Sequence, residues 1–235
     1  MQVDIWSDVV CPFCYIGQTR FEQALDRFAG RRQVHLTWRS FQLMPGLTTQ
    51  PGKPHDQVLA EVKGVSVAQA HEMNAQATRL AAQAGLTFHL DRAITGSTLR
   101  AHQLLQMARV EGRQEQVELA LFRAYFTDGR NVDDVPTLAE LGQASGLDPA
   151  AVTAALEAGT FIPAVEADLA EARRLGVRGV PFFVFDGKYA ISGAQSPEVF
   201  LGTLEKAFAE WQATQPAPAL QVIEGNTCTL DGECN

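Results

Sequence analysis

Two cysteines separated by only two residues, in the stretch SDVVCPFCYIG, constrain this chain more than any other feature of its sequence. Cys11 and Cys14 follow the run VDIWSDVV (residues 3–10), which is rich in branched residues and typical of a buried strand. Beyond the pair, apolar residues recur at three- and four-residue spacing as far as Phe28, which predicts an amphipathic helix. The cysteines are therefore expected at the junction between a strand and a helix.

The helix start gives the two cysteines different chemistry. Cys11 falls at the predicted N-terminus, and Pro12 suits the first helical turn, where its missing N–H has no cost. Unpaired N–H groups and the positive end of the helix dipole then favour a thiolate on Cys11. Cys14 lies one turn later and can reach a mixed disulfide formed on Cys11. Position alone predicts that Cys11 attacks a disulfide and that Cys14 resolves the product.

A zinc site is the first alternative for this pair. Cys228 and Cys234 near the C-terminus could complete a set of four sulfur ligands. That second pair is far away in the sequence and has five intervening residues, whereas zinc fingers and ribbons use two closely spaced pairs. The pattern therefore favours redox chemistry over zinc or a purely structural disulfide, and no metal is predicted.

The middle of the chain is predicted to be helical. A second strand, VHLTWRSFQL (34–43), precedes it. Between residues 55 and 162, helical segments follow one another, and several begin with Ser, Thr or Asp and end with Gly. These segments are 66–85, 97–112, 114–126, 136–146 and 148–159.

Strand patterns return near the end of the chain. A helix over 163–176 precedes two strand-like runs, 180–185 and 188–192, and a final helix is predicted over 196–212. The Asp186-Gly187 dipeptide between the two runs is a strong hairpin signal.

The order of these elements predicts an α/β fold with a small mixed sheet covered by helices. Residues 1–54 and 163–214 would form one discontinuous domain, and 55–162 a helical insertion within it. Residues 215–235 are expected to be a tail that carries the second cysteine pair.

Three motifs taken in order resemble the DsbA-like branch of the thioredoxin-fold dithiol oxidoreductases. They are the CPFC helix start, WRSFQLMPG (38–46) and GVRGVPFFVF (176–185), and together they are most similar to FrnE-like members. The resemblance covers about residues 2–212. It implies a thioredoxin fold with a large helical insertion, which acts by thiol–disulfide exchange on proteins and needs no bound cofactor.

The resemblance also implies a substrate-binding element. Pro181 would be cis and lie beside the dithiol, and the Val180 backbone would pair with an extended substrate chain. A cis bond before proline costs only about 0.5–1 kcal/mol, and proline has no N–H to compete for the sulfur. The alternative is a proline that merely starts a strand. Pro12 and Phe13 complete the expected substrate-binding residues.

Phe13 departs from the DsbA pattern. Strong oxidants of that family carry histidine at this position, which can stabilise the thiolate, whereas phenylalanine offers neither charge nor hydrogen bond. We therefore expect a reductase or disulfide isomerase. Related glutathione-dependent enzymes carry serine at the first motif position, so the two thiols here favour disulfide exchange. A glutathione-dependent isomerase or transferase of small molecules, and a non-enzymatic metal-binding or chaperone module, remain alternatives.

Charge and composition limit the partners. The net charge of −8, without a basic run, argues against nucleic acid or an anionic membrane. No apolar stretch approaches the roughly 18 residues of a membrane-spanning helix. The start MQVDIWSD shows no secretory signal, which predicts a cytoplasmic protein. Its expected partners are disulfide-containing or oxidised proteins and a thiol reductant, either glutathione or a thioredoxin-like system.

Several other residues carry weaker expectations. Asp8 is predicted to be a solvated or helix-capping carboxylate, with proton acceptance from Cys14 through water as the alternative. Trp6, Phe13 and Tyr15 could form an apolar rim for substrate, although Trp6 fits the core equally well. The histidines are all predicted to be structural or surface residues: His35, His55, His71, His89 and His102.

The tail sequence TCTLDGECN suggests a second disulfide. A three-residue loop, Leu230-Asp231-Gly232, would place Cys228 opposite Cys234 at a separation near disulfide range. We therefore predict a Cys228–Cys234 disulfide under oxidising conditions. It could be a second exchange centre or a clip on the terminus, and both interpretations stay open.

Overall fold

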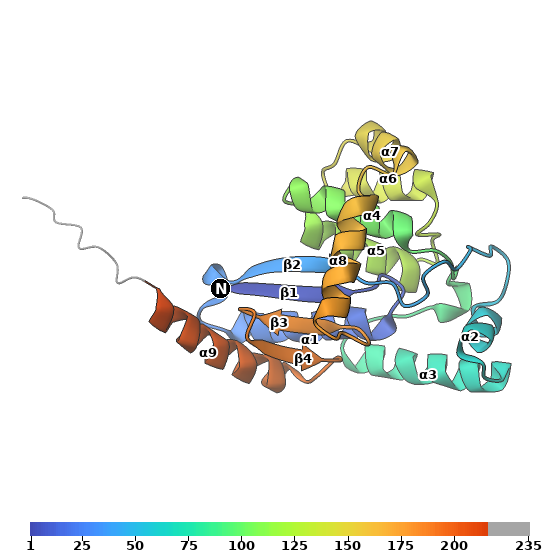
Figure 1. Cartoon of the computed structure of the whole chain (residues 1–235). Coiled ribbons are helices and arrows are strands. Elements are labelled where there is room, and N and C mark those ends of the chain that lie inside the picture. The colour runs from blue at the N-terminus through green and yellow to red at the C-terminus, as the bar shows by residue number, and fades with distance from the viewer. Residues whose placement is uncertain (216–235) are drawn as a thin grey trace, which may run out of the picture.

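A four-stranded sheet lies at the centre of the computed structural model, which describes residues 1–215 (Figure 1). The strands are β1 (Gln2–Ser7), β2 (His35–Ser40), β3 (Phe182–Phe185) and β4 (Tyr189–Ser192), in the order β2-β1-β3-β4. β1 and β2 are parallel, whereas β3 is antiparallel to both β1 and β4. This is the mixed sheet that the sequence predicts, with β1 ending before the cysteines.

The turn between β3 and β4 confirms the predicted hairpin. Asp186 and Gly187 adopt left-handed backbone conformations, with φ of 50° and 65°. The Lys188 N–H donates to the Phe185 carbonyl at 3.0 Å across the turn. Two consecutive left-handed residues match the right-handed twist of paired strands, which explains the Asp-Gly sequence.

Helices cover both faces of the sheet (Figure 1). α1 (Pro12–Arg27) and α9 (Pro197–Thr214) pack on one face, where Phe21 lies 5.4 Å from Phe183 between ring centroids. α8 (Ile162–Arg174) crosses the opposite face and packs there beside β2. Alternate residues of β1 and β3 supply the two apolar surfaces, as expected for a sheet buried on both sides.

The segment between β2 and α8 is helical, as predicted. Its helices are α2 (His55–Lys63), α3 (Val67–Gln83), α4 (Leu99–Val110), α5 (Gln114–Phe126), α6 (Val135–Ala144) and α7 (Pro149–Ala158). Short 3-10 turns occur at Arg31–Gln33 and Leu90–Arg92. One apolar cluster joins residues of these helices to the residues around the cysteines, including Val10 and Ile16. The division into two domains stays a prediction.

α2 is a helix that the sequence pattern does not predict. It is short, and it buries only Val58 and Ala60, so its apolar stripe is too brief to reveal a period. It follows Pro54 and ends at Gly64, whose left-handed φ of 67° closes the last turn.

Membrane-spanning potential is weak in residues 1–215. No single helix there combines the length and the apolar composition needed to cross a membrane. α7 and α8 meet those criteria only as a pair, across a bend of 67°. Gly159, with a left-handed φ of 67°, ends α7 at that bend.

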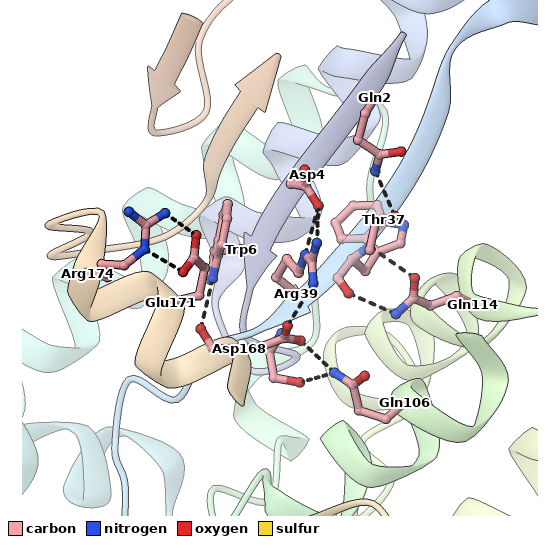
Figure 2. Close-up of polar contacts among 12 residues, drawn as sticks. Gln2, Asp4, Trp6, Thr37, Arg39, Gln106, Gln114, Asp168, Glu171 and Arg174 are labelled. Carbon is pink, nitrogen blue, oxygen red and sulfur yellow. Dashed lines mark hydrogen bonds and ion pairs between the residues drawn. The ribbon is translucent and has the colours of Figure 1, made fainter. Parts of the chain in front are cut away.

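A buried carboxylate ties α8 to the sheet and to α4 (Figure 2). Asp168 Oδ2 accepts hydrogen bonds from the Ser40 N–H at 2.9 Å and from Gln106 Nε2 at 2.6 Å. Its Oδ1 accepts one from Arg39 Nη1 at 3.1 Å, and its backbone carbonyl accepts one from Trp6 Nε1 at 3.2 Å. Asp168 therefore positions the helix that leads to the segment around Pro181.

Replacing Asp168 by alanine should destabilise the fold. The substitution leaves the buried Ser40 N–H without its acceptor, leaves Gln106 Nε2 with only the Ser40 hydroxyl to donate to, and removes a partner of Arg39. We expect the free energy of unfolding, measured by urea denaturation, to fall by roughly 3 kcal/mol. Glu171→Ala, on the same helix, breaks only an exposed ion pair with Arg174 and should have no measurable effect. Equal effects of the two substitutions would contradict this role for Asp168.

Candidate active site

Cys11 lies at the N-terminus of α1, where the sequence predicts it. It is the N-cap residue, with extended backbone angles (φ −87°, ψ 114°), and Pro12 follows in the first turn. The Cys11 N–H donates to the Asp8 carbonyl at 2.9 Å, and the Cys14 N–H donates to the Cys11 carbonyl at 3.0 Å. These bonds close the turn between β1 and α1 and place Cys11 at the free N–H end of the helix.

The two cysteines occupy different environments. Both are free thiols, and Cys11 lines a surface groove with 3% of its surface exposed, whereas Cys14 is fully buried. Burial raises the pKa of the Cys14 thiol well above its ordinary value, and a hydrogen bond and charge interaction with Cys11 raise it further. The geometry therefore makes Cys11 the thiol that a substrate meets first.

The Val180–Pro181 peptide bond is cis, and this segment lies beside the dithiol. The Cys11 thiol donates to the Val180 carbonyl, with 3.6 Å between sulfur and oxygen. α1 approaches the segment so closely that a Cβ on Gly17 would lie 2.9 Å from Pro181 Cγ. Arg20 Nη1 also donates to the Ala194 carbonyl at 2.8 Å, just beyond β4. Gly17 thus permits the contact that holds Pro181 against the cysteine helix.

A groove of about 390 Å3 opens in front of Cys11. Three of the predicted substrate-binding residues line it, namely Pro12, Phe13 and Val180, and the Phe13 side chain is 43% exposed. The opposite wall comes from α2 and α3, which no sequence pattern connects with the site. The groove as a whole is mostly apolar, and it also carries two basic residues, Lys63 and Arg178.

Only one of the three expected rim aromatics serves as rim. Trp6 is buried against α8 and donates to the Asp168 carbonyl, so its alternative placement in the core is correct. Tyr15 is half-buried and stacks on Phe122 of α5, with 4.9 Å between ring centroids. Phe13 alone faces the groove.

Asp8 is fully buried, so its prediction as a solvated or helix-capping carboxylate is wrong. Its Oδ2 accepts a hydrogen bond from the Leu43 N–H at 2.7 Å, and its Oδ1 lies 3.2 Å from His102 Nε2. The chain leaving β2 and helix α4 both fold over this carboxylate, and neither is adjacent to it in sequence. His102 is itself buried, in keeping with its structural prediction, whereas His55 lines the groove.

Glu118 is the least expected member of the site. It projects from α5 and is fully buried, and the Ser7 hydroxyl donates to its Oε1 at 2.9 Å. Burial raises the pKa of Glu118 to about 7, against the opposing effects of the Ser7 hydrogen bond and His102. Helical spacing places Glu118 on the same face of α5 as Leu121, Phe122 and Tyr125, and the structure buries all three. This apolar face is the one sequence pattern that indicates a buried Glu118.

Two predictions are not tested by this geometry: that no metal binds, and that Cys228 and Cys234 form a disulfide. In the part of the chain that the structure describes, no group of three His, Cys, Asp or Glu residues is placed to hold a metal ion. Cys228 and Cys234 fall outside the described residues. Their disulfide, and a zinc site that would need them, stay untested.

Comparison with known proteins identifies the family. The model of the "DSBA-like thioredoxin domain" family matches residues 2–205. The chain belongs to the DsbA-like thioredoxin family. Members of this family are thiol–disulfide oxidoreductases, and the thioredoxin fold with a helical insertion is confirmed. The assignment to the FrnE-like branch stays a prediction.

Three relatives show the range of this similarity. The probable DsbA oxidoreductase SCO1869 of Streptomyces coelicolor is 39% identical, with a TM-score of 0.82 over 100% of this chain and 98% of that one. The uncharacterised protein YwbO of Bacillus subtilis is 26% identical over 90% of this chain and 98% of its own. The cytosolic disulfide reductase DsbM of Pseudomonas aeruginosa, also solved with GSH, is 19% identical, with a TM-score of 0.62 over 89% and 100% of the two chains.

Gly17→Ala should lower disulfide-exchange activity without unfolding the protein. The added Cβ meets Pro181 and must displace it, which moves the Val180 carbonyl away from Cys11. Gly202→Ala in α9 is the matched control, because a Cβ there meets nothing within 4 Å. We expect the control to keep full activity and to gain up to about 1 kcal/mol of stability from better helix propensity. Equal activity of the two variants would show that the Gly17 contact does not position Pro181.

Glu118 should make stability depend on pH. Its folded pKa of about 7 lies above the ordinary value of 4.5, so the folded protein binds more protons than the unfolded chain between these pH values. The stability that Glu118 contributes is therefore fully present below its unfolded pKa and is lost as the pH rises through its folded pKa. The free energy of unfolding falls over this range by an amount on the order of 3 kcal/mol.

The measurement compares urea denaturation of the wild type and Glu118→Gln from pH 5 to pH 8. The variant should be the more stable of the two at pH 8, and its curve should be flatter. Glu115→Gln, an exposed change on the same helix, should follow the wild type. Parallel curves for Glu118→Gln and the wild type would rule out a raised Glu118 pKa.

Proposed function

We propose that this protein exchanges disulfides in protein substrates through Cys11 and Cys14, as a disulfide reductase or isomerase. One observation carries the proposal: Cys11 lines an open groove beside a cis-proline segment, whereas Cys14 is buried behind it. An attacking thiol that lines the groove and a resolving thiol buried behind it are what a two-step exchange requires.

The reaction proceeds through a mixed disulfide. The Cys11 thiolate attacks one sulfur of a substrate disulfide and releases the other sulfur as a thiolate, which takes a proton from solvent. Cys14, as a thiolate, then attacks the Cys11 sulfur and releases the second substrate thiolate. The substrate gains two electrons, and the protein is left with a Cys11–Cys14 disulfide.

Extended protein segments fit the groove. The Val180 backbone lies against the Cys11 sulfur and can pair with a substrate chain held in extended form. Pro181 has no N–H to compete for the sulfur. Leu59, Met73 and Ala77 of α2 and α3, together with the exposed Phe13, suit apolar side chains of an unfolded segment.

Reduction or isomerisation is favoured over strong oxidation. Phe13 brings no charge and no hydrogen bond to the Cys11 thiolate, and it points into the groove. We infer that a thiol reductant in a reducing compartment, the cytoplasm, regenerates the dithiol. Glutathione is the reductant that we propose, because Lys63 and Arg178 offer charge for its carboxylates. The description of DsbM as cytosolic, and its structure with GSH, support this choice.

Two assays on two variants test the proposal. Insulin-disulfide reduction and the refolding of a scrambled disulfide protein should both fall to the uncatalysed rate in Cys11→Ser. Cys14→Ser should still attack and should accumulate a mixed disulfide that mass spectrometry detects. Full activity of Cys11→Ser in both assays would refute the proposal. Turnover of a small organic substrate with glutathione, without insulin reduction, would favour the isomerase or transferase alternative.

A further inference from the structure

A second pocket lies between the chain leaving β2, helix α4 and the corner where α7 meets α8. Its volume is about 510 Å3, and none of its lining residues lines the groove in front of Cys11. Part of its wall is apolar and comes from Leu47, Leu156 and Ile162. We call it the corner pocket. The exchange reaction as written above makes no use of it.

Gln103 of α4 lines the corner pocket with a buried amide group. The residue is 2% exposed, and within residues 1–215 its Oε1 has no hydrogen-bond partner. Buried polar atoms are nearly always paired, because an unpaired one bears the full cost of losing its water. Gln106 on the same helix is paired in this way, since its Nε2 donates to Ser40 Oγ at 2.9 Å and to Asp168 Oδ2 at 2.6 Å. Gln103 therefore has an acceptor to offer to a molecule in the pocket.

Several other polar side chains of the pocket are paired with one another. Thr49 Oγ1 donates to Asp133 Oδ2 at 2.6 Å and accepts the Ser97 N–H at 3.1 Å. Arg100 Nη1 donates to the backbone carbonyl and to Oδ1 of Asp133, at 3.2 Å and 3.4 Å. Arg100 and Asp133 thus compensate each other, and Glu157, the remaining charged residue of the lining, is exposed to solvent. This lining suits a neutral ligand.

The unpaired amide is complementary to a peptide group. A carboxamide accepts at Oε1 and donates at Nε2, and a peptide unit offers the matching N–H and C=O. Two amides that face each other form a pair of hydrogen bonds, and the match is the same if the Gln103 amide is turned over. The apolar wall beside Gln103 suits an apolar side chain on that peptide.

The corner pocket adjoins the groove at Cys11. Thr95 lines the groove and Ser97 lines the pocket, and two residues span at most about 7 Å. Gly96 between them lets this segment pack against the chain leaving β2, because a Cβ there would collide with the Thr49 side chain. The partition between the two sites is therefore only one or two chain segments thick.

We propose that the corner pocket is a second binding site for protein clients, in which Gln103 pairs with a peptide unit outside the disulfide itself. This inference rests on the proposed exchange reaction, because that reaction brings a polypeptide to Cys11. The client's disulfide reacts at Cys11 while an apolar residue of the same client occupies the corner pocket. Two linked contacts raise the affinity for polypeptides but not for small disulfides.

A stability measurement distinguishes a binding role of Gln103 from a structural one. Leucine has a similar size and no polar atom to leave unpaired, so Gln103→Leu should raise the urea midpoint of unfolding while it weakens peptide binding. A structural glutamine would behave in the opposite way, because its loss would lower the midpoint.

The first binding experiment needs no disulfide. The reduced full-length protein, labelled with 15N, is titrated with N-acetyl-leucine N-methylamide, a neutral probe with an apolar side chain between two amide groups. The backbone amide resonances of Ser97 and Ile162 should shift saturably, because both residues line the pocket. The Kd of the probe should rise roughly tenfold in Gln103→Leu, as expected for the loss of a pair of hydrogen bonds.

The second experiment compares a protein client with a small disulfide. In Gln103→Leu, kcat/KM for insulin reduction should fall roughly tenfold. The reduction of cystine, which is too short to reach the pocket, should keep its wild-type rate. Ala158→Trp blocks the pocket from an exposed position and should give the same selective loss. Gln143→Leu makes the same substitution at an exposed position of α6 and should match the wild type in both assays.

Three results would each overturn the inference. The probe shifts neither Ser97 nor Ile162, or it binds Gln103→Leu as tightly as the wild type, or insulin and cystine reduction fall equally in Gln103→Leu. A lowered urea midpoint in that variant would likewise make the glutamine structural. Failure of the exchange reaction is recognised separately, because Cys11→Ser would then reduce insulin at the wild-type rate while the probe still binds.

Discussion

The position of Cys11 depends on the turn that Asp8 forms between β1 and α1. The backbone carbonyl of Asp8 accepts the Cys11 N–H, while its buried carboxylate accepts the Leu43 N–H and contacts His102. One residue therefore fixes the helix start to the chain leaving β2 and to α4. A buried carboxylate with these partners is expensive to disturb, because each partner would lose its hydrogen bond in an apolar interior. The sheet supplies the strand, but the inserted helices hold the end of that strand in place.

The helices between β2 and α8 are consequently part of the candidate active site. α2 and α3 supply a wall of the groove, α4 supplies His102, and α5 supplies Glu118. The substrate side of Cys11 and the buried side of Cys14 are thus shaped by the same stretch of chain. Changes in that stretch can alter which substrates bind, while the sheet stays the same.

Local patterns were enough to predict the strands, most helices, the hairpin at Asp186 and the cysteines at a helix start, because each depends on neighbouring residues. The cis bond at Pro181 followed from family resemblance. Asp8 was misjudged because its partners are brought to it by tertiary folding, and polarity near a turn usually means exposure. Glu118 was missed for a related reason: its partner Ser7 is 111 residues away, and only its place on an apolar helical face hints at burial. Helix α2 could not be predicted because it buries too few residues for its apolar pattern to show a helical period.

The anchoring of α8 by Asp168 has a consequence for how clients bind. This anchor holds the chain that leads into Val180, and the contact of Gly17 with Pro181 holds the same segment further along. The backbone that we propose to pair with a client is thus preorganised before the client arrives. Nearly all the conformational entropy lost on binding then belongs to the client chain, which is smallest for segments that are already extended or strained. On the proposed function, affinity should therefore fall as the client chain around its disulfide becomes more disordered.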